Sequence, residues 1–196
     1  MMPAVRTYRQ AYASHRRLKG KPRERLILYS LRLLLGPEFT VRRVPTREQK
    51  NSREHVPDLR IFYRSRFLAE VEVTGTDIAW RRMILKGWIF VLPSKADYAM
   101  KRGAQYIYVF FNDAEYPDGE WLLWLHGHDL ARHADLARSL GQVWRNKTIH
   151  GVEETYLMIP KRAFNTGLRS LVHYLKYLAG LVPDPRPTAL VNFMVG

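Results

Sequence analysis

Pro57–Thr74 reads PDLRIFYRSRFLAEVEVT, and its second half alternates between apolar and acidic side chains. Neighbouring side chains of a strand point to opposite faces, so Ala69 and Val71 would face a core. Glu70 and Glu72 then share the other face, with Cα atoms about 7 Å apart along the strand. Like charges placed in this way repel each other unless something positive lies between them. The positive partner is either a basic side chain or a divalent metal ion.

Basic residues outnumber acidic ones, with 32 Lys and Arg against 18 Asp and Glu and a formal net charge of +14. Such an excess favours a polyanionic partner, because neutralising phosphates releases the counterions condensed on them. Nucleic acid is therefore the expected partner, and a basic protein that is merely soluble is the alternative. A membrane surface is not expected as a partner, since no long amphipathic segment with a Lys and Arg face stands out.

The composition and the motifs exclude several classes of protein. The chain has no Cys, which excludes disulfides, thiolate metal sites and a thiol nucleophile. Its apolar runs are too short to cross a bilayer. Its basic start lacks the apolar segment of a secretory signal, so we expect a cytoplasmic protein. Gly-rich phosphate loops and a Gly-x-Ser-x-Gly elbow are absent as well.

The length of 196 residues is enough for one domain with a substantial core. We expect this domain over residues 22–181. A basic N-terminal arm at 1–21 would precede it, and a Pro-rich C-terminal tail at 182–196 would follow.

Helices and strands are predicted from periodicity, caps and turn signals. The predicted helices are at 22–35, 94–102, 129–140 and 168–178, with Ser94 and Asp97 as an N-cap pair. The predicted strands are at 39–44, 58–63, 67–73, 105–111, 121–125 and 155–159, while 78–91 is ambiguous. This order of elements predicts a mixed α/β sheet with helices on its faces.

The acidic residues suggest a chemistry. A tight turn between the two strands of the opening stretch would bring Asp58 nearer to Glu72 than to Glu70. Carboxylates from neighbouring strands can converge on Mg²⁺ or Mn²⁺, which prefer oxygen ligands. Such an ion can turn water into hydroxide and stabilise a leaving oxygen, as phosphodiester hydrolysis requires. Glu24, on the inward stripe of helix 22–35, either complements the positive helix end or supplies a further acid.

Pro57-Asp58, followed by Glu70-Val71-Glu72 on an apolar strand, resembles the motif of the PD-(D/E)xK nuclease superfamily. The likeness covers residues 22–111 and includes the order of the elements. It implies an α/β fold with a restriction-endonuclease-like mixed β-sheet flanked by helices. It also implies an endonuclease that uses Mg²⁺ or Mn²⁺ to hydrolyse DNA, duplex or branched, and many such nucleases act as homodimers.

Carried over by position, the resemblance makes Asp58 and Glu70 metal ligands and matches Glu24 to an acid of the first helix. The departure is at Glu72, where the superfamily usually has Lys and some restriction endonucleases have Glu. Glu72 can ligate a metal or accept a proton from the attacking water, but it cannot supply a positive charge.

Lys95 is a candidate for the missing positive charge, because it lies in the first turn of the helix that follows the motif. A cation at a helix start is unfavourable by roughly a few tenths of a kcal/mol, so we expect a compensating contact. The alternative is a lysine surrounded by solvent. Lys86 is a weaker candidate for the same role.

Basic and aromatic residues elsewhere in the chain are candidates for binding nucleic acid. The residues that we expect to contact phosphates are Arg16, Arg17, Lys19, Lys21, Arg81, Arg82 and Lys86. For the N-terminal arm, the alternative is a solvated terminus. Trp80, Trp88 and Tyr98 either stack on bases or fill a core.

Other functions remain open from the sequence. His126, His128 and His133 are of a metal-ligating type, but they lack the i, i+4 spacing of a helical zinc site, so we expect a surface helix there. A non-catalytic nucleic-acid-binding protein would use the same basic surface, with its acids neutralised by Arg. A subunit that binds another protein through its charge is a third possibility. DNA and RNA cannot be told apart from these residues.

Overall fold

The computed structural model describes residues 21–45, 48, 55–82, 87–117, 120–147 and 153–184. The predicted N-terminal arm up to residue 20 and most of the predicted C-terminal tail lie outside these residues. So do four of the predicted contacts to nucleic acid, namely Arg16, Arg17, Lys19 and Lys86. None of the described helices is long and apolar enough to cross a membrane.

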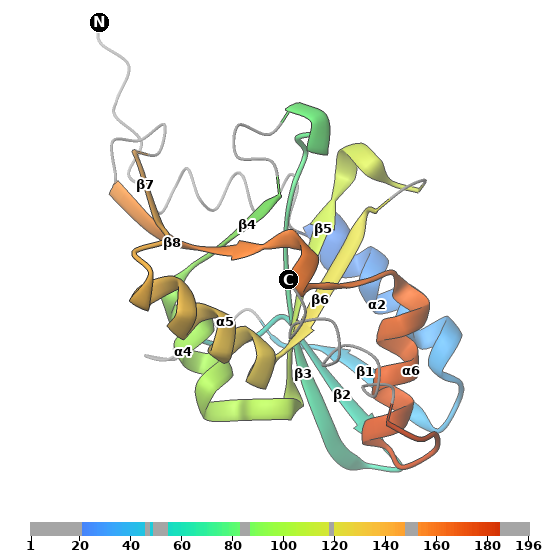
Figure 1. The fold of residues 1–196 in the computed structure, drawn as a ribbon. Coiled ribbons are helices and arrows are strands. Elements are labelled where there is room, and N and C mark those ends of the chain that lie inside the picture. The colour runs from blue at the N-terminus through green and yellow to red at the C-terminus, as the bar shows by residue number, and fades with distance from the viewer. Residues whose placement is uncertain are drawn as a thin grey trace, which may run out of the picture.

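The larger of two sheets has the strand order β1-β2-β3-β5-β6-β9 (Figure 1). Its strands are β1 (Phe39–Arg43), β2 (Leu59–Tyr63), β3 (Arg66–Thr76), β5 (Tyr106–Asn112), β6 (Leu122–His126) and β9 (Asn165–Thr166). β3 and β5 pair in parallel, whereas the other neighbours are antiparallel. The predicted mixed sheet is therefore confirmed, with β9 as an edge strand that the sequence did not indicate.

A smaller sheet has the strand order β4-β8-β7 (Figure 1). Its strands are β4 (Trp88–Val91), β7 (Val143–Lys147) and β8 (Glu153–Pro160). The ambiguous segment 78–91 thus contains a short 3₁₀ helix, η2 (Trp80–Arg82), and the edge strand β4. β7 was not predicted, because its sequence VWRNK is short, largely polar and without an alternating pattern.

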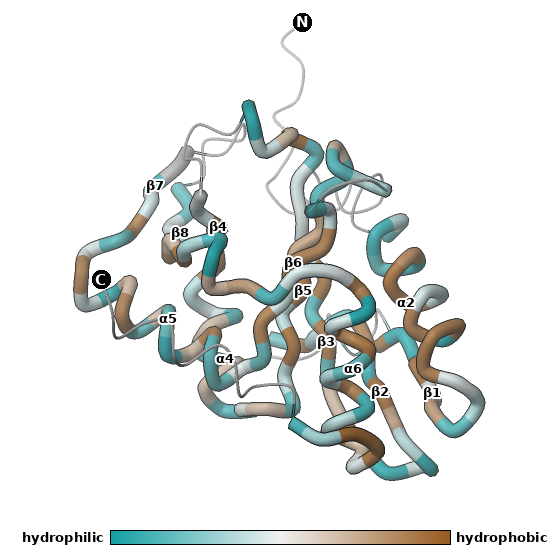
Figure 2. Tube along the Cα trace, turned by 45° about the vertical axis from the view of Figure 1, so that its right-hand side comes forward, coloured by the Kyte–Doolittle hydropathy of each residue, from teal (hydrophilic) through white to brown (hydrophobic). Residues whose placement is uncertain are grey.

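Helices cover both faces of the larger sheet (Figure 1). The described helices are α2 (Lys21–Leu35), α4 (Pro93–Arg102), α5 (Gly127–Ser139) and α6 (Leu168–Leu178). Ile27 of α2 and Leu171 of α6 pack with Val71 of β3 on one face. Ala99 of α4 and Leu130 of α5 belong to a second apolar cluster on the other face, which also includes the smaller sheet. Figure 2 shows apolar segments in brown on α2 and along the central strands.

The β2–β3 hairpin sets the position of Asp58. Its two-residue turn, Arg64-Ser65, has φ angles of 46° and 64°, a left-handed conformation that matches the twist of paired strands. The register shifts by one after Ile61, which leaves Leu68 as the extra residue of a β-bulge. With this register the Asp58 N–H donates to the Val71 carbonyl oxygen at 3.1 Å.

The start of α4 differs from the prediction. Ser94 does not cap this helix, because Leu92 is the N-cap residue and makes no side-chain hydrogen bond. Pro93 begins the helix instead, at the position where its missing N–H costs nothing. Asp97 forms an ion pair with Arg138 of α5 at 2.5 Å.

The start of α5 lies at Gly127, two residues before the predicted Asp129. The His126 ring nitrogen Nδ1 accepts a hydrogen bond from the Asp129 N–H at 3.4 Å and caps the helix. A Cβ on Gly127 would lie 2.2 Å from the Gly103 carbonyl oxygen. Glycine is therefore needed for α5 to approach the end of α4.

Candidate active site

Three buried acids from different elements gather where β2 begins. Glu24 belongs to α2, Asp58 directly precedes β2 and Glu72 lies in β3. Their exposed fractions are 3%, 5% and 6%. Glu72 and Glu24 are close enough to Asp58 for their charges to raise its pKa. The fold therefore concentrates negative charge in its interior around Asp58.

The Asp58 carboxyl is held by the backbone of the neighbouring strand. Its Oδ2 accepts a hydrogen bond from the Val73 N–H at 2.9 Å. Burial, followed by the negative charges of Glu72 and Glu24, raises the pKa of Asp58 to about 8. Asp58 is therefore mostly protonated at neutral pH. A divalent cation among these acids would remove the repulsion and favour the ionised carboxylate.

Glu72 lies between two nitrogen-bearing side chains. Its Oε1 is 2.6 Å from Nζ of Lys95, and its Oε2 is 3.1 Å from Nε2 of His55. The His55 nitrogen is close but is not aligned as a hydrogen bond. Burial opposes ionisation of Glu72, but Lys95 and His55 outweigh it and lower the pKa to about 2. Glu72 is therefore a carboxylate at neutral pH.

Lys95 reaches the acids from the first turn of α4. Its side chain is only 12% exposed, so it is not the solvated lysine of the alternative interpretation. Burial alone would lower the pKa of Lys95, but the Glu72 carboxylate raises it above the ordinary value. The Lys95 ammonium also lies 5.8 Å from the centre of the Tyr108 ring. The compensating contact for a cation at this helix start is thus Glu72.

Glu70 has different surroundings from Glu72. Arg102 donates to it twice, from Nε at 3.0 Å and from Nη2 at 3.1 Å, and the Tyr98 hydroxyl donates at 2.7 Å. Arg60 adds a longer contact of 3.4 Å. The sequence resemblance paired Glu70 with Asp58. In the structure it is Glu72 whose charge raises the pKa of Asp58, and Glu70 is held by guanidinium groups.

Glu24 is paired with Arg43 of β1. Its carboxylate is buried, whereas the Arg43 side chain is about one-third exposed. Glu24 therefore lies within the acidic group and is partly neutralised from the solvent side. The structure combines the two roles that the sequence left open, because Glu24 is both in the first turn of α2 and close to Asp58.

Sequence reasoning missed two residues of this group. His55 lies three positions before Asp58, in a segment for which neither a helix nor a strand is predicted. Its ring packs edge-on against Tyr98 at 5.2 Å and Tyr106 at 6.3 Å. The Tyr106 hydroxyl is fully buried and has no hydrogen-bond partner among the described residues. The nearness of His55 to Pro57-Asp58 was the available signal, while nothing marked Tyr106 within its apolar strand.

The donor atoms fit a hard divalent cation. Carboxylate oxygens of Asp58, Glu72 and Glu24 are the ligand type that Mg²⁺ and Mn²⁺ prefer. Within the described ranges, however, no three His, Asp or Glu side chains already stand close enough to hold an ion together. Lys95 and His55 occupy the two oxygens of Glu72, so binding of a metal would require these contacts to rearrange.

The remaining predicted residues are basic side chains and three histidines. Arg81 and Arg82 are exposed in η2, just beyond the end of β3, and Lys21 is partly exposed at the start of α2. The three histidines 126, 128 and 133 form no metal group in the described structure, and His126 Nε2 lies 2.8 Å from Asp129.

Comparison with known proteins gives a similarity of fold. No protein-family model matches the chain, and no curated protein matches its sequence. A solved structure, that of D212, a nuclease from a fusselovirus, is similar with a TM-score of 0.52 and 20% sequence identity. The match covers 83% of this chain and 95% of that chain. At this level of identity the comparison shows that the two proteins share a fold.

Proposed function

We propose that this protein is a metal-dependent endonuclease that hydrolyses the phosphodiester bonds of DNA. The observation that carries the proposal is the buried group of Asp58, Glu72 and Lys95 on a mixed sheet. The fold shared with a viral nuclease and the net charge of +14 support it. The resemblance of Pro57-Asp58 and the acidic strand to the PD-(D/E)xK superfamily supports it further.

The geometry favours a shifted assignment of the motif. Glu72, and not Glu70, is the strand acid that faces Asp58, and Lys95 provides the amine that the strand itself lacks. The β-bulge at Leu68 explains the shift, because one extra residue in β3 moves Glu72 into register with Asp58. Glu70 would then position α4 through Arg102 and Tyr98.

In this proposal Asp58, Glu72 and Glu24 would hold Mg²⁺ or Mn²⁺. The bound ion supplies an acidified water and neutralises charge on the phosphate. Lys95 would orient the water or stabilise the phosphate, since its ammonium is the buried cation closest to Glu72 in the described structure. His55 would keep the Glu72 carboxylate in its ionised form. We also propose a cytoplasmic location and a homodimer, which would allow both strands of a duplex to be cut.

A second candidate function is nucleic-acid binding without hydrolysis. The specific observation in its favour is that the strand acids are already neutralised, Glu72 by Lys95 and Glu70 by Arg102. In that case the acids would hold α4 on the sheet, and the basic surface would bind nucleic acid. RNA and DNA are both compatible with this alternative.

The test is to incubate the protein with duplex, branched and single-stranded DNA, and with RNA, in Mg²⁺, in Mn²⁺ and in EDTA. We expect cleavage of DNA that requires the metal and is lost in Asp58→Asn. Asp135→Asn is the matched control, because Asp135 is 57% exposed on α5. Wild-type protein that binds DNA but never cuts it under either metal would favour the second function.

A further inference from the structure

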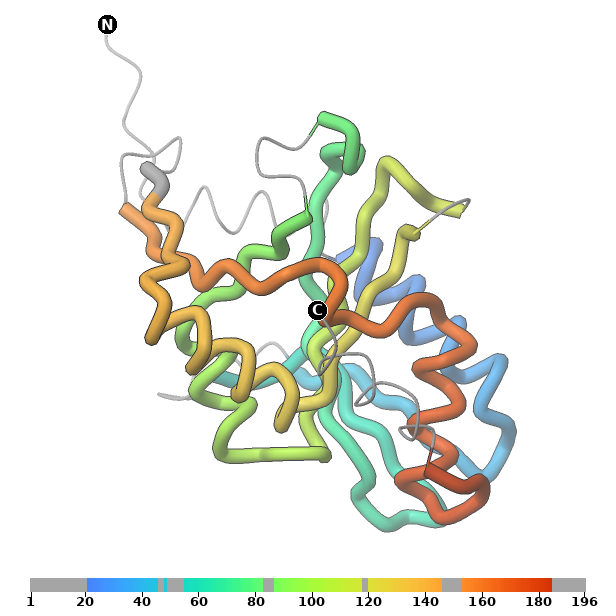
Figure 3. Tube along the Cα trace, in the orientation of Figure 1, coloured from blue at the N-terminus to red at the C-terminus, as the bar shows by residue number. Residues whose placement is uncertain are grey.

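A pocket of about 580 Å³ opens where the smaller sheet meets the larger one. It is lined by Trp88 at the start of β4, by Pro160 to Arg162 at the end of β8, and by Glu120 and Phe164. In Figure 3 the chain leaves β8 and crosses from the smaller sheet to α6 in this region. The pocket is therefore built from segments far apart in the sequence.

The pocket lies on the same face of the larger sheet as the candidate active site. The Lys95 ammonium is 5.8 Å from the Tyr108 ring centre, and the Tyr108 ring is 6.3 Å from that of Phe164. Phe164 in turn lines the pocket. Tyr108 is thus a shared neighbour of Lys95 and of a residue that lines the pocket.

One wall of the pocket carries a pair of opposite charges. Lys161 forms an ion pair with Glu120, and its ammonium lies 4.4 Å from the centre of the Trp80 ring. The Trp80 ring nitrogen donates to the Glu120 carbonyl oxygen at 3.0 Å. Lys161 and Glu120 thus balance each other's charge on this wall, and each remains partly exposed.

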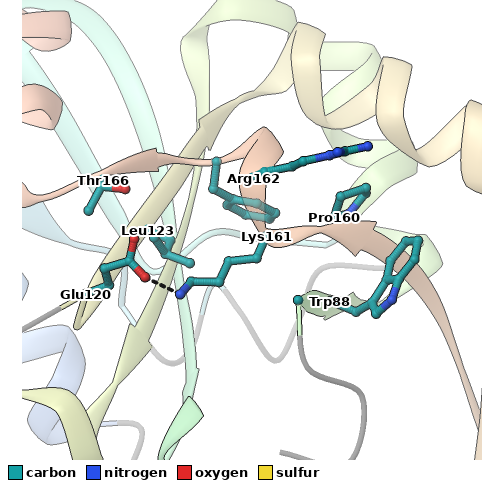
Figure 4. A pocket seen from close by; sticks show the side chains of 9 residues that line it. Trp88, Glu120, Leu123, Pro160, Lys161, Arg162 and Thr166 are labelled. Carbon is teal, nitrogen blue, oxygen red and sulfur yellow. Dashed lines mark hydrogen bonds and ion pairs between the residues drawn. The ribbon is translucent and has the colours of Figure 1, made fainter. Parts of the chain in front are cut away.

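The opposite wall offers a ring and a cation. Figure 4 shows Arg162, Pro160 and Trp88 on one side of the pocket, away from the Lys161–Glu120 pair. Arg162 is exposed and forms no ion pair within the described residues, and the partly exposed Trp88 ring stacks on no other described ring. An indole face suits a nucleobase, and a guanidinium suits a phosphate.

We propose that this pocket binds one unpaired nucleotide of the nucleic-acid substrate, with its base on Trp88 and a phosphate on Arg162. The inference rests on the proposed function, because the occupant is a nucleotide next to the bond to be cut. A base within an intact duplex would first have to leave its stack, which costs roughly a few kcal/mol. The protein should therefore prefer strands with an unpaired segment, such as flaps, junction arms or single strands.

The test measures binding and not cutting, so that it stands apart from the nuclease proposal. A fluorescein-labelled oligo-dT and a blunt duplex of equal length are titrated in EDTA, and anisotropy gives the affinities. We expect tighter binding of oligo-dT, and Trp88→Ala should weaken it by about tenfold or more, the effect of one lost stack. The logarithm of the affinity falls as the logarithm of the salt concentration rises. Arg162→Gln should make this negative slope shallower by about one, while Trp88→Ala should leave it unchanged.

Two controls keep the test decisive. Arg25→Gln removes an exposed arginine from α2, on the far face of the sheet, and should change oligo-dT binding much less than Arg162→Gln. Trp88→Phe keeps an aromatic ring and should retain most of the affinity if Trp88→Ala folds poorly. Equal affinity for oligo-dT and duplex, or unchanged oligo-dT binding by both Trp88→Ala and Arg162→Gln, would overturn the proposal. Loss of cleavage alone would not bear on it.

Discussion

Glu70 and Glu72 project from the same face of β3 two residues apart, yet they have different surroundings. Glu70 is held by Arg102 and Tyr98 of α4 and by Arg60 of β2. Glu72 has one buried lysine and one histidine, and it faces a second acid, Asp58. The charge of Glu72 thus acts on Asp58 and raises its pKa, whereas the charge of Glu70 is balanced by its arginines. Two identical side chains on one strand can therefore differ in role: one holds a helix on the sheet, and the other keeps a negative charge next to a second acid.

The largest expected effect is the difference in cleavage activity between variants of the two glutamates. Glu72→Gln should reduce metal-dependent DNA cleavage to background, because it removes a proposed metal ligand. Glu70→Gln should lower cleavage by about 10- to 100-fold, the usual range for a residue that orients the groups around a metal site. Single-turnover cleavage rates with saturating Mn²⁺ give both values. If Glu70→Gln is the inactive variant and Glu72→Gln still cuts, the assignment from sequence position is correct and the shifted assignment is wrong.

The next effect concerns how much the cation beside each glutamate, Lys95 or Arg102, contributes to the free energy of unfolding. Lys95→Met should lower the free energy of unfolding by about 3 kcal/mol, because it leaves a buried carboxylate without its partner. The double variant Lys95→Met/Glu72→Gln should recover most of this loss, since no unpaired charge is then left. Urea unfolding followed by circular dichroism measures both. No recovery in the double variant would mean that Lys95 stabilises the fold by packing and not by charge.

A third comparison concerns the proton on Asp58. Because burial and Glu72 raise its pKa from 3.8 to about 8, its contribution to stability is complete below 3.8 and is lost as the pH rises towards 8. The free energy of unfolding should therefore decrease over this window in the wild type by up to about 1.4 kcal/mol per pH unit relative to Asp58→Asn. Urea unfolding across the pH range measures this slope.

A divalent cation should reverse this behaviour, because it favours the ionised form of Asp58. Near neutral pH, binding of Mg²⁺ should release up to about one proton in the wild type and none from this position in Asp58→Asn. Calorimetric titration of Mg²⁺ in two buffers of different ionisation heat counts the protons. Equal proton release by the two proteins would place the metal away from Asp58.

The smallest effect is expected on the Glu70 side. Arg102→Gln should lower the free energy of unfolding by only about 1 kcal/mol, because Arg102 is 43% exposed and Glu70 keeps Arg60 and Tyr98. The same chemical denaturation measures it. A loss as large as that of Lys95→Met would show that the two regions do not differ in the way proposed.

Much of the fold could be predicted from local patterns. The helix at 168–178 and the hairpin of β2 and β3 agree with their predicted ranges to within a few residues, because caps, turns and alternation are local signals. The smaller sheet could not be predicted in the same way. β4 pairs with β8 across a large sequence separation that no short-range pattern reports, and β7, which pairs with the other edge of β8, has no alternating pattern of its own.

The candidate site was predictable in its residue types and only partly in its arrangement. Asp58, Glu72, Glu24 and Lys95 were all candidates from the sequence, and the structure brings them together. The expected tight turn already predicted that Asp58 lies nearer to Glu72, whereas the resemblance pointed to Glu70. The structure agrees with the turn, through a register that includes a β-bulge at Leu68, which no local pattern marks. His55 was missed because a loop residue gives no periodic signal.

The parallel pairing of β3 with β5 has a consequence for folding during translation. Two parallel neighbours need a crossover between them, and here the crossover contains β4 and the Lys95 helix, so Glu72 lies opposite Tyr108. A nascent chain therefore cannot complete this centre until translation has passed β5. Any activity that needs both acids and the lysine would be absent from ribosome-bound fragments that end before that strand, and it would arise only after the crossover closes.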